Sequence, residues 1–380
     1  MNLPPIYPLT DSRRDASLSA QVRAFGEAGF PLVQFRGKPL DAEAQYGEIR
    51  TSLQQSFDNG GWPLLCVNDR ADLALLAAKE GLSPWGLHLG QSDLPPSEAR
   101  KLPGLEWVHI GTSTHGESEW SSVDPACDHA GVGPFRATST KADHAAPIGL
   151  DGLRRGCVAL RSRGVAPIAI GGLCQADFED VFAAGAESVA LITELERKDP
   201  AELAWWAQAA RWKAQPAMRK NQGIVLVGSS GAGKSTLASK LGPRLGFPVV
   251  DLDVLIEGRA GPSIPQIFEQ QGEAAFRRLE VEALRSNLDK PSVMALGGGA
   301  WASPEIRDAL NASGFAVLWI AETPEVCWSR IATDSTRPLA KDRDEFMRRH
   351  RVRMQNWCEL PVVLPLGRGA DEIADSLVKR

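Results

Sequence analysis

The sequence lacks the features of membrane-bound and disulfide-stabilised proteins. Its 380 residues contain no apolar run near the roughly 20 residues that a helix needs to cross a bilayer. The start MNLPPIYPLTDSRRD has no basic stretch followed by an apolar core, so we expect no signal peptide. The six cysteines are scattered, without a CxxC pair or a disulfide-like spacing. We therefore expect reduced thiols in a cytoplasmic protein.

A strong charge imbalance is also missing. The 42 Lys and Arg residues against 47 Asp and Glu residues leave a formal net charge of −5, which argues against a nucleic-acid binder. Hydrophobic residues make up 43% of the chain and charged residues 23%, as in ordinary globular proteins. The length suits two domains. We expect small-molecule substrates and neither a membrane nor a nucleic acid as partner, and the oligomeric state stays open.

One motif past the middle of the chain, GSSGAGKST at 228–236, is highly informative. It follows the apolar run 223–227 and precedes the helix-like pattern 237–241, which is the strand–loop–helix context of a phosphate-binding P-loop. The glycines let backbone N–H groups close around a phosphate, Lys234 reaches its outer oxygens, and the Ser235 hydroxyl holds Mg²⁺. The residues expected to bind ATP are Gly228, Gly231, Ala232, Gly233, Lys234, Ser235 and Thr236.

The residues before this motif predict a different fold. Short apolar runs alternate with stretches of helical spacing such as 19–28 and 71–79. The eight runs are Ile6–Asp11, Pro31–Arg36, Leu64–Asp69, Trp85–Gly90, Trp107–Ser113, Ala130–Phe135, Ala166–Gly172 and Ser188–Thr193. Eight strands alternating with helices predict a TIM (β/α)8 barrel, with a doubly wound open sheet as the alternative.

Polar residues gather at the carboxyl ends of these strands, where a barrel carries its active site. They are Gln34, Arg36, Lys38, Asn68, Asp69, His88, Gln91, Asp93, Ser113, His115, Thr138, Thr140, Lys141, Gly171, Gly172 and Thr193. The acids Asp69 and Asp93 suit Mg²⁺. The cluster Arg36, Lys38, Asn68 and Lys141 suits a polyphosphate. The glycine pair and the end of the eighth strand suit a second phosphate.

The same segment resembles thiamine-phosphate synthase. The resemblance rests on VQFRGK, VNDRADLAL, GLHLGQSDLP, GTSTH, GVGPFRATSTKAD, IAIGGL and SVALIT, taken in their order and spacing. It implies that a hydroxymethylpyrimidine pyrophosphate ionises to a carbocation, which the nitrogen of a thiazole phosphate captures. The related thiazole tautomerases share the barrel but tend to lose the metal and pyrophosphate ligands, so the ligands present here favour the synthase.

This resemblance implies four groups of site residues in the barrel. The Mg²⁺ ligands are Asp69 and Asp93, and the pyrophosphate ligands are Arg36, Lys38, Asn68 and Lys141. The pyrimidine pocket is lined by Gln34 and His88, with Ser113 near the reacting centre. The thiazole phosphate is received by Thr138, Thr140, Gly172, Ile192 and Thr193.

The C-terminal part carries more polar residues that suit phosphoryl transfer. Acids at Asp251 and Asp253 follow a second predicted strand, where they fit Mg²⁺ coordination and proton acceptance from a substrate hydroxyl. Asp253 is alternatively a helix cap. Arg277 is near a helix-borne acid, and the glycines 297–299 permit close approach of a ligand. The basic run 343–353 is mostly a solvated helix face.

From Gly223 almost to its end the chain resembles shikimate kinase. The motifs are GSSGAGKST, DLD, SIPQIFEQQGEAAFRRLE, LGGGA, STRPL and the RxxxW element at Arg353. The resemblance implies that Lys234, Ser235 and Asp251 bind ATP and Mg²⁺, and that Asp253 accepts the proton of the shikimate 3-hydroxyl. The implied substrate ligands are Arg277, Gly298, Gly299 and Arg353, and Arg337 is the implied lid arginine that reaches the transferring phosphate.

Together these features predict a bifunctional α/β enzyme. Its parts are a barrel at 1–214, a linker at 215–222 and a P-loop kinase α/β/α domain with a parallel sheet at 223–380. Both sites are expected to use Mg²⁺, and ATP is the phosphoryl donor of the second. Two alternatives stay open, because fold alone does not prove activity. One domain is a sensor or scaffold for the other, or the kinase acts on another small hydroxy acid.

Overall fold

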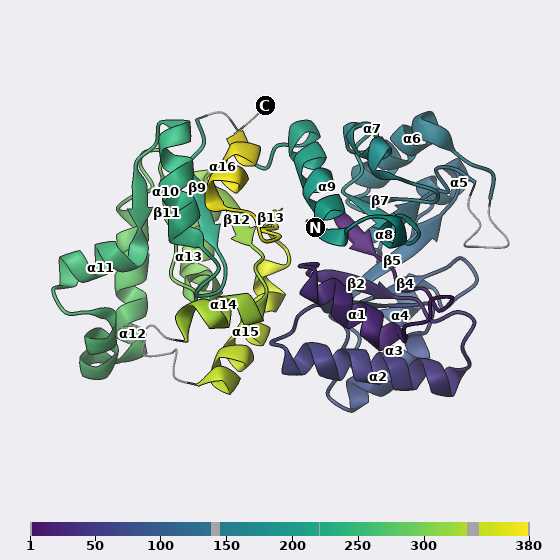
Figure 1. Cartoon of the computed structure of the whole chain (residues 1–380), viewed down its shortest axis with the longest axis horizontal. Coiled ribbons are helices and arrows are strands. Elements are labelled where there is room, and N and C mark those ends of the chain that lie inside the picture. The colour runs from purple at the N-terminus through teal and green to yellow at the C-terminus, as the bar shows by residue number, and fades with distance from the viewer. Residues whose placement is uncertain (1, 138–144, 220, 333–341, 379–380) are drawn as a thin grey trace. The chain divides into compact units, whose positions relative to one another are not determined.

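The structure is a computed structural model that describes residues 2–137, 145–219, 221–332 and 342–378. The site residues Thr138, Thr140, Lys141 and Arg337, which the sequence predicted, lie outside the described residues. The chain divides into two compact units, Met1–Gln215 and Pro216–Arg380 (Figure 1). Each unit has its own sheet, and each is described below by itself.

The first unit alternates eight strands with helices. The strands are β1 (Ile6–Pro8), β2 (Leu32–Phe35), β3 (Leu64–Asn68), β4 (Gly86–Leu89), β5 (His109–Thr114), β6 (His129–Val132), β7 (Ala166–Ile170) and β8 (Ser188–Leu191). The helices are α1 (Leu18–Glu27), α2 (Ala42–Asp58), α3 (Ala71–Lys79), α4 (Pro96–Ala99), α5 (Glu117–Ser121), α6 (Gly149–Ser162), the 3-10 turn η1 (Gln175–Asp177), α7 (Phe178–Ala183), α8 (Glu194–Arg197) and α9 (Pro200–Ala214).

All neighbouring strands of this unit run parallel, in the order β1-β8-β7-β6-β5-β4-β3-β2. Leu9, just after β1, forms a parallel bridge with Gln34 of β2, and the Thr10 amide donates to the Gln34 carbonyl at 3.0 Å. These contacts bring the two outer strands together into a nearly closed barrel. The predicted parallel α/β fold of this unit is therefore confirmed, and its carboxyl strand ends form one face.

The strands are apolar because both of their faces are covered. The barrel interior includes buried side chains such as Tyr7, Leu32, Cys66 and Ile168, and the helices pack around the outside (Figure 1). Polar residues are confined largely to the strand ends, where backbone and side chains can meet a ligand.

The last helix, α9, completes the opposite end of the barrel. The buried Arg211 guanidinium donates to the Leu3 carbonyl and to the carboxylate of Glu187, which also accepts from Arg161 at 3.0 Å. Gln215, the first residue of the predicted linker, donates to the carbonyls of Phe182 and Ala186 at 2.9 and 3.0 Å. The barrel contacts of this chain therefore extend through Gln215.

The described residues of the second unit form a sheet of five strands. The strands are β9 (Ile224–Val227), β10 (Val249–Asp251), β11 (Val293–Ala295), β12 (Ala316–Ile320) and β13 (Val362–Val363). Its helices are α10 (Lys234–Leu245), α11 (Leu252–Ala260), α12 (Ile264–Arg285), the 3-10 turn η2 (Ala300–Ala302), α13 (Pro304–Ser313), α14 (Pro324–Ile331), α15 (Arg343–Trp357) and α16 (Ala370–Val378).

The sheet of this unit is parallel, in the order β10-β11-β9-β12-β13. The central strand β9 is fully buried and leads through the glycine-rich loop into α10. Because the strands are parallel, the ends of β9, β10 and β11 meet at one edge of the sheet. This edge brings the P-loop, Asp251 and the glycines 297–299 together.

The final helix α16 lies beside α10 (Figure 1). Arg244 of α10 pairs with Asp375 at 2.7 Å and with Asp371 at 3.0 Å, and Lys240 pairs with Asp371 at 3.0 Å. These largely exposed pairs fix the orientation of the two helices more than they add stability.

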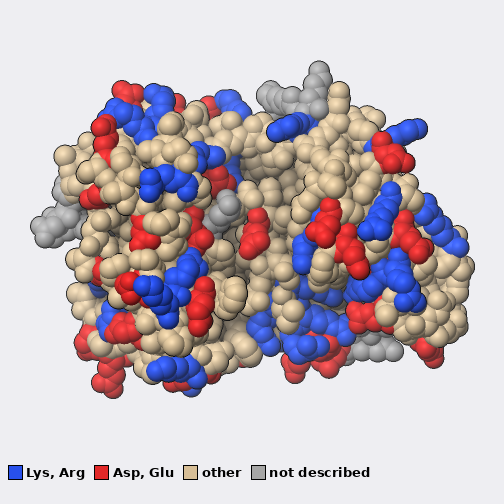
Figure 2. Space-filling model, turned by 180° about the vertical axis from the view of Figure 1, so that it is seen from behind, with Lys and Arg blue, Asp and Glu red and all other residues tan. Residues whose placement is uncertain are grey.

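The surface agrees with the mixed charge of the sequence. Basic and acidic side chains lie among one another over the face drawn in Figure 2. All six cysteines fall in the described part of the chain, and all are free. Within that part, no helix combines the length and the apolar character that crossing a bilayer requires.

Candidate active sites

The first site is a cavity of about 550 Å³ at the carboxyl ends of the barrel strands. Its lining includes every described residue that the sequence predicted for the barrel site. These are Gln34, Arg36, Lys38, Asn68, Asp69, His88, Asp93, Ser113, Gly172, Ile192 and Thr193. These residues come from six separate strand ends and share one cavity, as expected for parallel strands in a barrel.

Two carboxylates and a lysine form one side of this cavity. Asp69 has a left-handed backbone with φ of 63°, which is unusual for a residue with a side chain. The Lys38 ammonium lies 2.5 Å from Asp69 Oδ2, and the Gly90 amide donates to Asp93 Oδ2 at 2.7 Å. Burial raises the pKa of Asp93, the Asp69 charge adds to this, and the Gly90 bond acts in the opposite direction.

This arrangement fits a divalent cation. Two neighbouring carboxylates repel each other when both are charged, and a cation between them would relieve that repulsion. Within the described ranges, no group of three or more His, Cys, Asp and Glu side chains could hold a metal. Asp69 and Asp93 would therefore supply only part of a Mg²⁺ shell, and phosphate oxygens and water are the usual remaining ligands of this ion.

Neutral polar groups form the floor of the cavity. The Gln34 amide donates to Asn68 Oδ1 at 3.0 Å, and His88 Nε2 lies 3.0 Å from the Ser113 hydroxyl. Gln91, which also lines the cavity, donates to the Ser113 carbonyl at 2.6 Å. These bonds hold amide and imidazole groups in fixed orientations, as recognition of a heteroaromatic ring requires.

The glycine pair after β7 forms another wall. Gly171 has φ of 97°, and a Cβ there would lie 2.6 Å from Pro134 Cα, so a larger residue does not fit. Gly172, Ile192 and Thr193 line the cavity beside it. Exposed backbone amides at such a turn suit an anionic phosphate.

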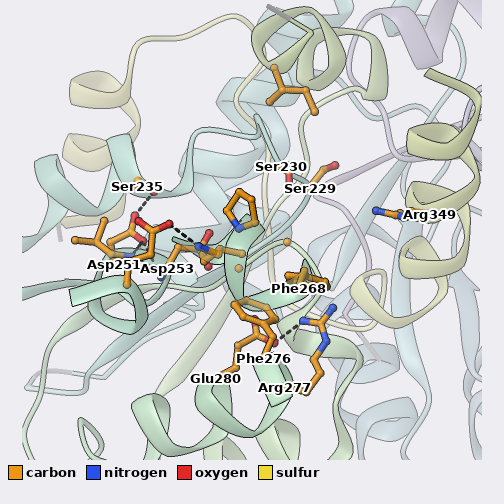
Figure 3. A pocket seen from close by; sticks show the side chains of 18 of the residues that line it. Ser229, Ser230, Ser235, Asp251, Asp253, Phe268, Phe276, Arg277, Glu280 and Arg349 are labelled. Carbon is orange, nitrogen blue, oxygen red and sulfur yellow. Dashed lines mark hydrogen bonds and ion pairs between the residues drawn. The ribbon is translucent and has the colours of Figure 1, made fainter. Parts of the chain in front are cut away.

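The second site is a cavity of about 400 Å³ at the strand edge of the other unit (Figure 3). Its lining includes Ser229 and Ser230 of the P-loop, the acids Asp251 and Asp253, and the arginines Arg277, Arg349 and Arg353. The glycines 297–299 also line it.

The P-loop backbone requires glycine. Gly231 has φ of 85°, and a Cβ there would lie 2.3 Å from the Cys327 carbonyl oxygen. The Lys234 ammonium donates to the carbonyls of Gly228 and Ser229 at 3.0 and 2.8 Å. The loop is thus wrapped around the lysine side chain, in a conformation that suits the binding of a nucleotide phosphate. Ala232, Gly233 and Thr236 belong to the same loop and first helical turn.

The hydroxyl and carboxylate expected to bind Mg²⁺ are in contact. The Ser235 hydroxyl donates to Asp251 Oδ2 at 2.5 Å (Figure 3). Asp251 Oδ1 accepts from the Asp253 amide at 3.1 Å, so Asp251 is itself the cap of α11. The alternative role of Asp253 as the cap of this helix is therefore wrong, because the helix begins at Leu252.

A second acid accompanies Asp253 at the acceptor end of the cavity. A Cβ on Gly297 would lie 2.9 Å from Asp253 Oδ1 and 2.8 Å from Glu280 Oε1, so both carboxylates lie against this glycine. Glu280 is fully buried and pairs with Arg277. Burial raises its pKa, Arg277 opposes this, and the Asp253 charge raises it further.

The expected substrate arginines also meet. A Cβ on Gly299 would lie 2.8 Å from Arg277 Nη2 and 2.9 Å from Arg353 Nη2. Burial lowers the pKa of Arg353 to about 10, and the charges of Arg277 and Arg349 act in the same direction. Because Gly299 has no side chain, the two guanidiniums beside it can both bind one carboxylate.

Sequence reasoning missed three features of this site. Arg330 of α14 donates to the Gly231 carbonyl at 2.9 Å and to Glu322 at 3.0 Å, so it buttresses the P-loop. Arg349 belongs to the run interpreted as a solvated face, yet it lines the cavity. Its spacing of four residues from Arg353 was the available signal, because such residues share a helix face. Phe268 and Phe276 also line the cavity, and the sequence analysis gave them no role although both lie in the motif SIPQIFEQQGEAAFRRLE.

The fold and the two cavities define an α/β protein with two separate phosphate-competent sites. The model of the thiamine monophosphate synthase family matches residues 6–195, which is half of the chain, and that of the shikimate kinase family matches residues 230–379. The chain therefore belongs to the thiamine monophosphate synthase family through its first unit and to the shikimate kinase family through its second. Both are families of transferases, so the chain is an enzyme of that class.

Individual relatives agree. Thiamine-phosphate synthase of Chloroflexus aurantiacus is 39% identical over 198 residues, which are 51% of this chain and 86% of the relative. Shikimate kinase of Xanthomonas axonopodis pv. citri is 40% identical over 127 residues, 33% of this chain and 70% of the relative. The solved structure of shikimate kinase from Acinetobacter baumannii in complex with shikimate aligns at 30% identity with a TM-score of 0.39, over 45% of this chain and 94% of that one.

Proposed function

We propose that the chain is a bifunctional enzyme that forms thiamine phosphate in its barrel and phosphorylates shikimate in its P-loop unit. The observation that carries the kinase half is the common cavity of Ser235, Asp253, Arg277 and Arg353. For the barrel half it is the pair Asp69 and Asp93 beside Lys38. The family assignments support both halves.

In the barrel the bond between the pyrimidine methylene carbon and the pyrophosphate oxygen breaks, and pyrophosphate leaves with the electron pair. Arg36, Lys38 and Asn68 stabilise its charge, with Lys141 from outside the described residues. The thiazole nitrogen then donates its electron pair to form the new C–N bond. Gln34 and His88 hold the pyrimidine, and Ser113 lies near the reacting carbon. Such a step needs charge stabilisation more than it needs a base.

The thiazole substrate carries a phosphate, and the glycine pair supports its binding. Gly172, Ile192 and Thr193 line the same cavity as the proposed pyrophosphate ligands. Thr138 and Thr140 complete the proposed ligand set from outside the described residues. Both phosphate groups are then fixed, so the nitrogen and the methylene carbon are held close together.

In the P-loop unit Asp253 accepts the proton of the shikimate 3-hydroxyl, and the oxygen attacks the γ-phosphorus of ATP while ADP leaves. Arg277 and Arg353 grip the shikimate carboxylate, and Gly298 and Gly299 let the ring approach closely. Lys234 stabilises the transferring phosphoryl group, as does Arg337 from outside the described residues. In-line geometry and charge stabilisation provide most of the catalysis of such reactions.

Mg²⁺ is the proposed cofactor of both sites. Asp69 and Asp93 would hold it in the barrel, and Ser235 and Asp251 would hold it in the P-loop unit. Bound there, it would neutralise charge on the pyrophosphate or on the ATP phosphates. The carboxylate pairing in the barrel and the contact between Ser235 and Asp251 support these ligand sets.

The test is to assay the purified chain with each substrate pair and to repeat both assays with Asp253→Asn. We expect both products from the wild-type chain. The variant should lose on the order of 100-fold or more of its shikimate phosphorylation, because a general base contributes roughly that much. Its thiamine phosphate formation should stay unchanged.

Other outcomes of this test point to the alternatives. A wild-type chain that forms only one product would identify the other unit as a sensor or scaffold. Phosphorylation of a different hydroxy acid, without turnover of shikimate, would exclude the proposed kinase substrate. Loss of both activities in Asp253→Asn would exclude two independent sites.

A further inference from the structure

The acid-binding end of the P-loop cavity holds one more cation than the family motifs account for. Arg277 of α12 and Arg353 of α15 meet against Gly299. Arg349 lies one helical turn before Arg353 and lines the same cavity. In Figure 3 its side chain reaches the cavity from the side opposite Asp251 and Asp253. Three guanidiniums therefore line this cavity, two of them against Gly299.

The position of Arg349 is fixed by a specific partner. Its Nε donates to Glu345 Oε1 at 2.5 Å, and its side chain is 31% exposed. Glu345 also accepts from Arg348 at 2.6 and 2.7 Å, but Arg348 is 58% exposed and does not line this cavity. One carboxylate thus holds two arginines. Arg349 lines the substrate cavity, whereas Arg348 lines only a neighbouring hollow, which it shares with Arg349 and Arg353.

Carboxylates accompany the arginines at this end of the cavity. Glu280 pairs with Arg277, Glu273 accepts from the same arginine at 2.9 Å, and Glu345 pairs with Arg349. Burial lowers the pKa of Arg353, and the charges of Arg277 and Arg349 lower it further, so both of these cations repel Arg353. An anion bound among them would relieve that repulsion.

We propose that Arg349 is a specificity-determining residue of the kinase, which selects a carboxylate-bearing substrate by adding a third positive charge around its acid group. This inference rests on the proposed function and extends it. Arg277 and Arg353 grip the carboxylate directly, whereas Arg349, tied to Glu345 at the rim, acts through its charge on the approach and retention of the acid. It has no part in the proton transfer at Asp253.

The test compares Arg349→Gln with Arg348→Gln in the full-length chain, with shikimate as the varied substrate. Both variants remove one positive charge from the same helix and one partner from Glu345. For Arg349→Gln we expect KM for shikimate to rise about threefold to fivefold, the effect of one partly exposed charge pair. The kcat and KM for ATP should stay within twofold of wild type, and added salt should raise KM less than it does for wild type. Arg348→Gln should resemble wild type.

Arg349→Lys separates charge from packing. It keeps the charge, so KM for shikimate should return close to the wild-type value. An equal KM for Arg349→Gln and Arg348→Gln would overturn the inference, as would a loss of kcat without a change in KM. Failure of the wild-type chain to phosphorylate shikimate would instead overturn the proposed function and this inference with it.

Discussion

At the scale of single residues, the chemistry depends on side chains that the backbone holds in unusual places. Asp69 is a clear case, because a residue with a Cβ rarely adopts φ of 63°. Strained residues of this kind cluster at functional sites, where the surrounding structure maintains them. Asn and Asp tolerate this conformation best, so an acid is compatible with it while most other residues are not.

Two substitutions at Asp69 should separate its charge from its conformation. Asp69→Asn keeps a residue that tolerates the left-handed region, so thermal unfolding should be unchanged, but thiamine phosphate formation at saturating Mg²⁺ should fall on the order of 100-fold. Asp69→Ala should lose the same activity and, in addition, about 1 kcal/mol of stability. Unfolding curves and initial rates over a range of Mg²⁺ concentrations measure both effects.

Asp72→Asn is the matched control for this experiment. It removes one carboxylate three positions further on, where the side chain is 65% exposed and pairs with Arg70. It should leave the rate unchanged. An Asp69→Asn enzyme with the wild-type response to Mg²⁺ would exclude Asp69 as a metal ligand.

Residue-level prediction from the sequence was strongest where a motif fixes the geometry. The strand ends of a parallel barrel must meet, so the sequence predicts that Gln34, Asp69 and Ser113 share one cavity, and all three line it. Arg349 was missed because a basic run on a helix is usually solvated, and sequence does not reveal which face turns toward a cavity. Contacts such as that between Arg330 and Gly231 depend on packing across about 100 residues and carry no local pattern.

At the scale of elements, the loop between β9 and α10 joins the sheet to the proposed nucleotide site. Its glycines satisfy two requirements at once, a left-handed backbone and the absence of a side chain against a neighbouring carbonyl. The apolar run and helical pattern on its two sides identified this element correctly from sequence. Its contact with Cys327 of α14 was not predictable, because that residue lies almost 100 positions later.

Gly231→Ala should therefore damage the nucleotide site. A Cβ would meet the Cys327 carbonyl at 2.3 Å with φ of 85°, so the loop must shift. We expect KM for ATP to rise on the order of 10-fold or more and the second unit to lose about 1 to 3 kcal/mol of stability. Kinase assays with varied ATP and thermal unfolding are the measurements.

Gly246→Ala provides the comparison, at the other end of α10. Gly246 caps α10 with φ of 69°, but nothing lies within 4 Å of a Cβ there. This variant should lose about 1 kcal/mol from backbone strain and keep its KM for ATP. If Gly231→Ala bound ATP as well as Gly246→Ala, the close approach would have no role in the phosphate site.

Strand and helix boundaries were predicted less well than their order. The apolar run 6–11 forms a strand only over β1, and the residues after it turn toward β2 through the Leu9 bridge. The run 107–113 begins its strand at His109, because the exposed Trp107 precedes the sheet. Periodicity identifies which segments are buried but not where backbone pairing ends.

At the scale of the whole molecule, each unit has a core with its own chemistry. The barrel interior contains a buried histidine, His129, which packs near Tyr7, Trp85 and His88. Burial lowers the pKa of His129 well below its ordinary value, and His88 and His109 act in the same direction. Its neutral form is therefore the one that the folded barrel accepts.

Acid should selectively weaken the barrel. Below about pH 6.5 the unfolded chain binds a proton at His129, whereas the folded barrel does not. The free energy of unfolding therefore keeps its full value above that pH and falls as the pH drops below it. The expected slope approaches about 1.4 kcal/mol per pH unit for this one group. Hydrogen exchange between pH 7 and pH 5.5, followed separately in peptides from residues 1–215 and 216–380, measures it.

His129→Leu should remove this contribution to the slope of unfolding free energy against pH, even if the variant is less stable than wild type at every pH. His115→Gln is the control, because His115 is partly exposed and lies 3.1 Å from Glu119. Equal slopes in wild type and His129→Leu would show that another group drives the acid sensitivity.

The contacts of Arg211, at the end of the barrel opposite the cavity, have a consequence for protein synthesis. Its guanidinium joins Leu3, near the start of the chain, to Glu187 beside β8. A ribosome must therefore translate α9 before this contact between the first and last barrel segments can form. Because units fold in the order of translation, the emerging barrel can complete itself while the P-loop unit is still being made.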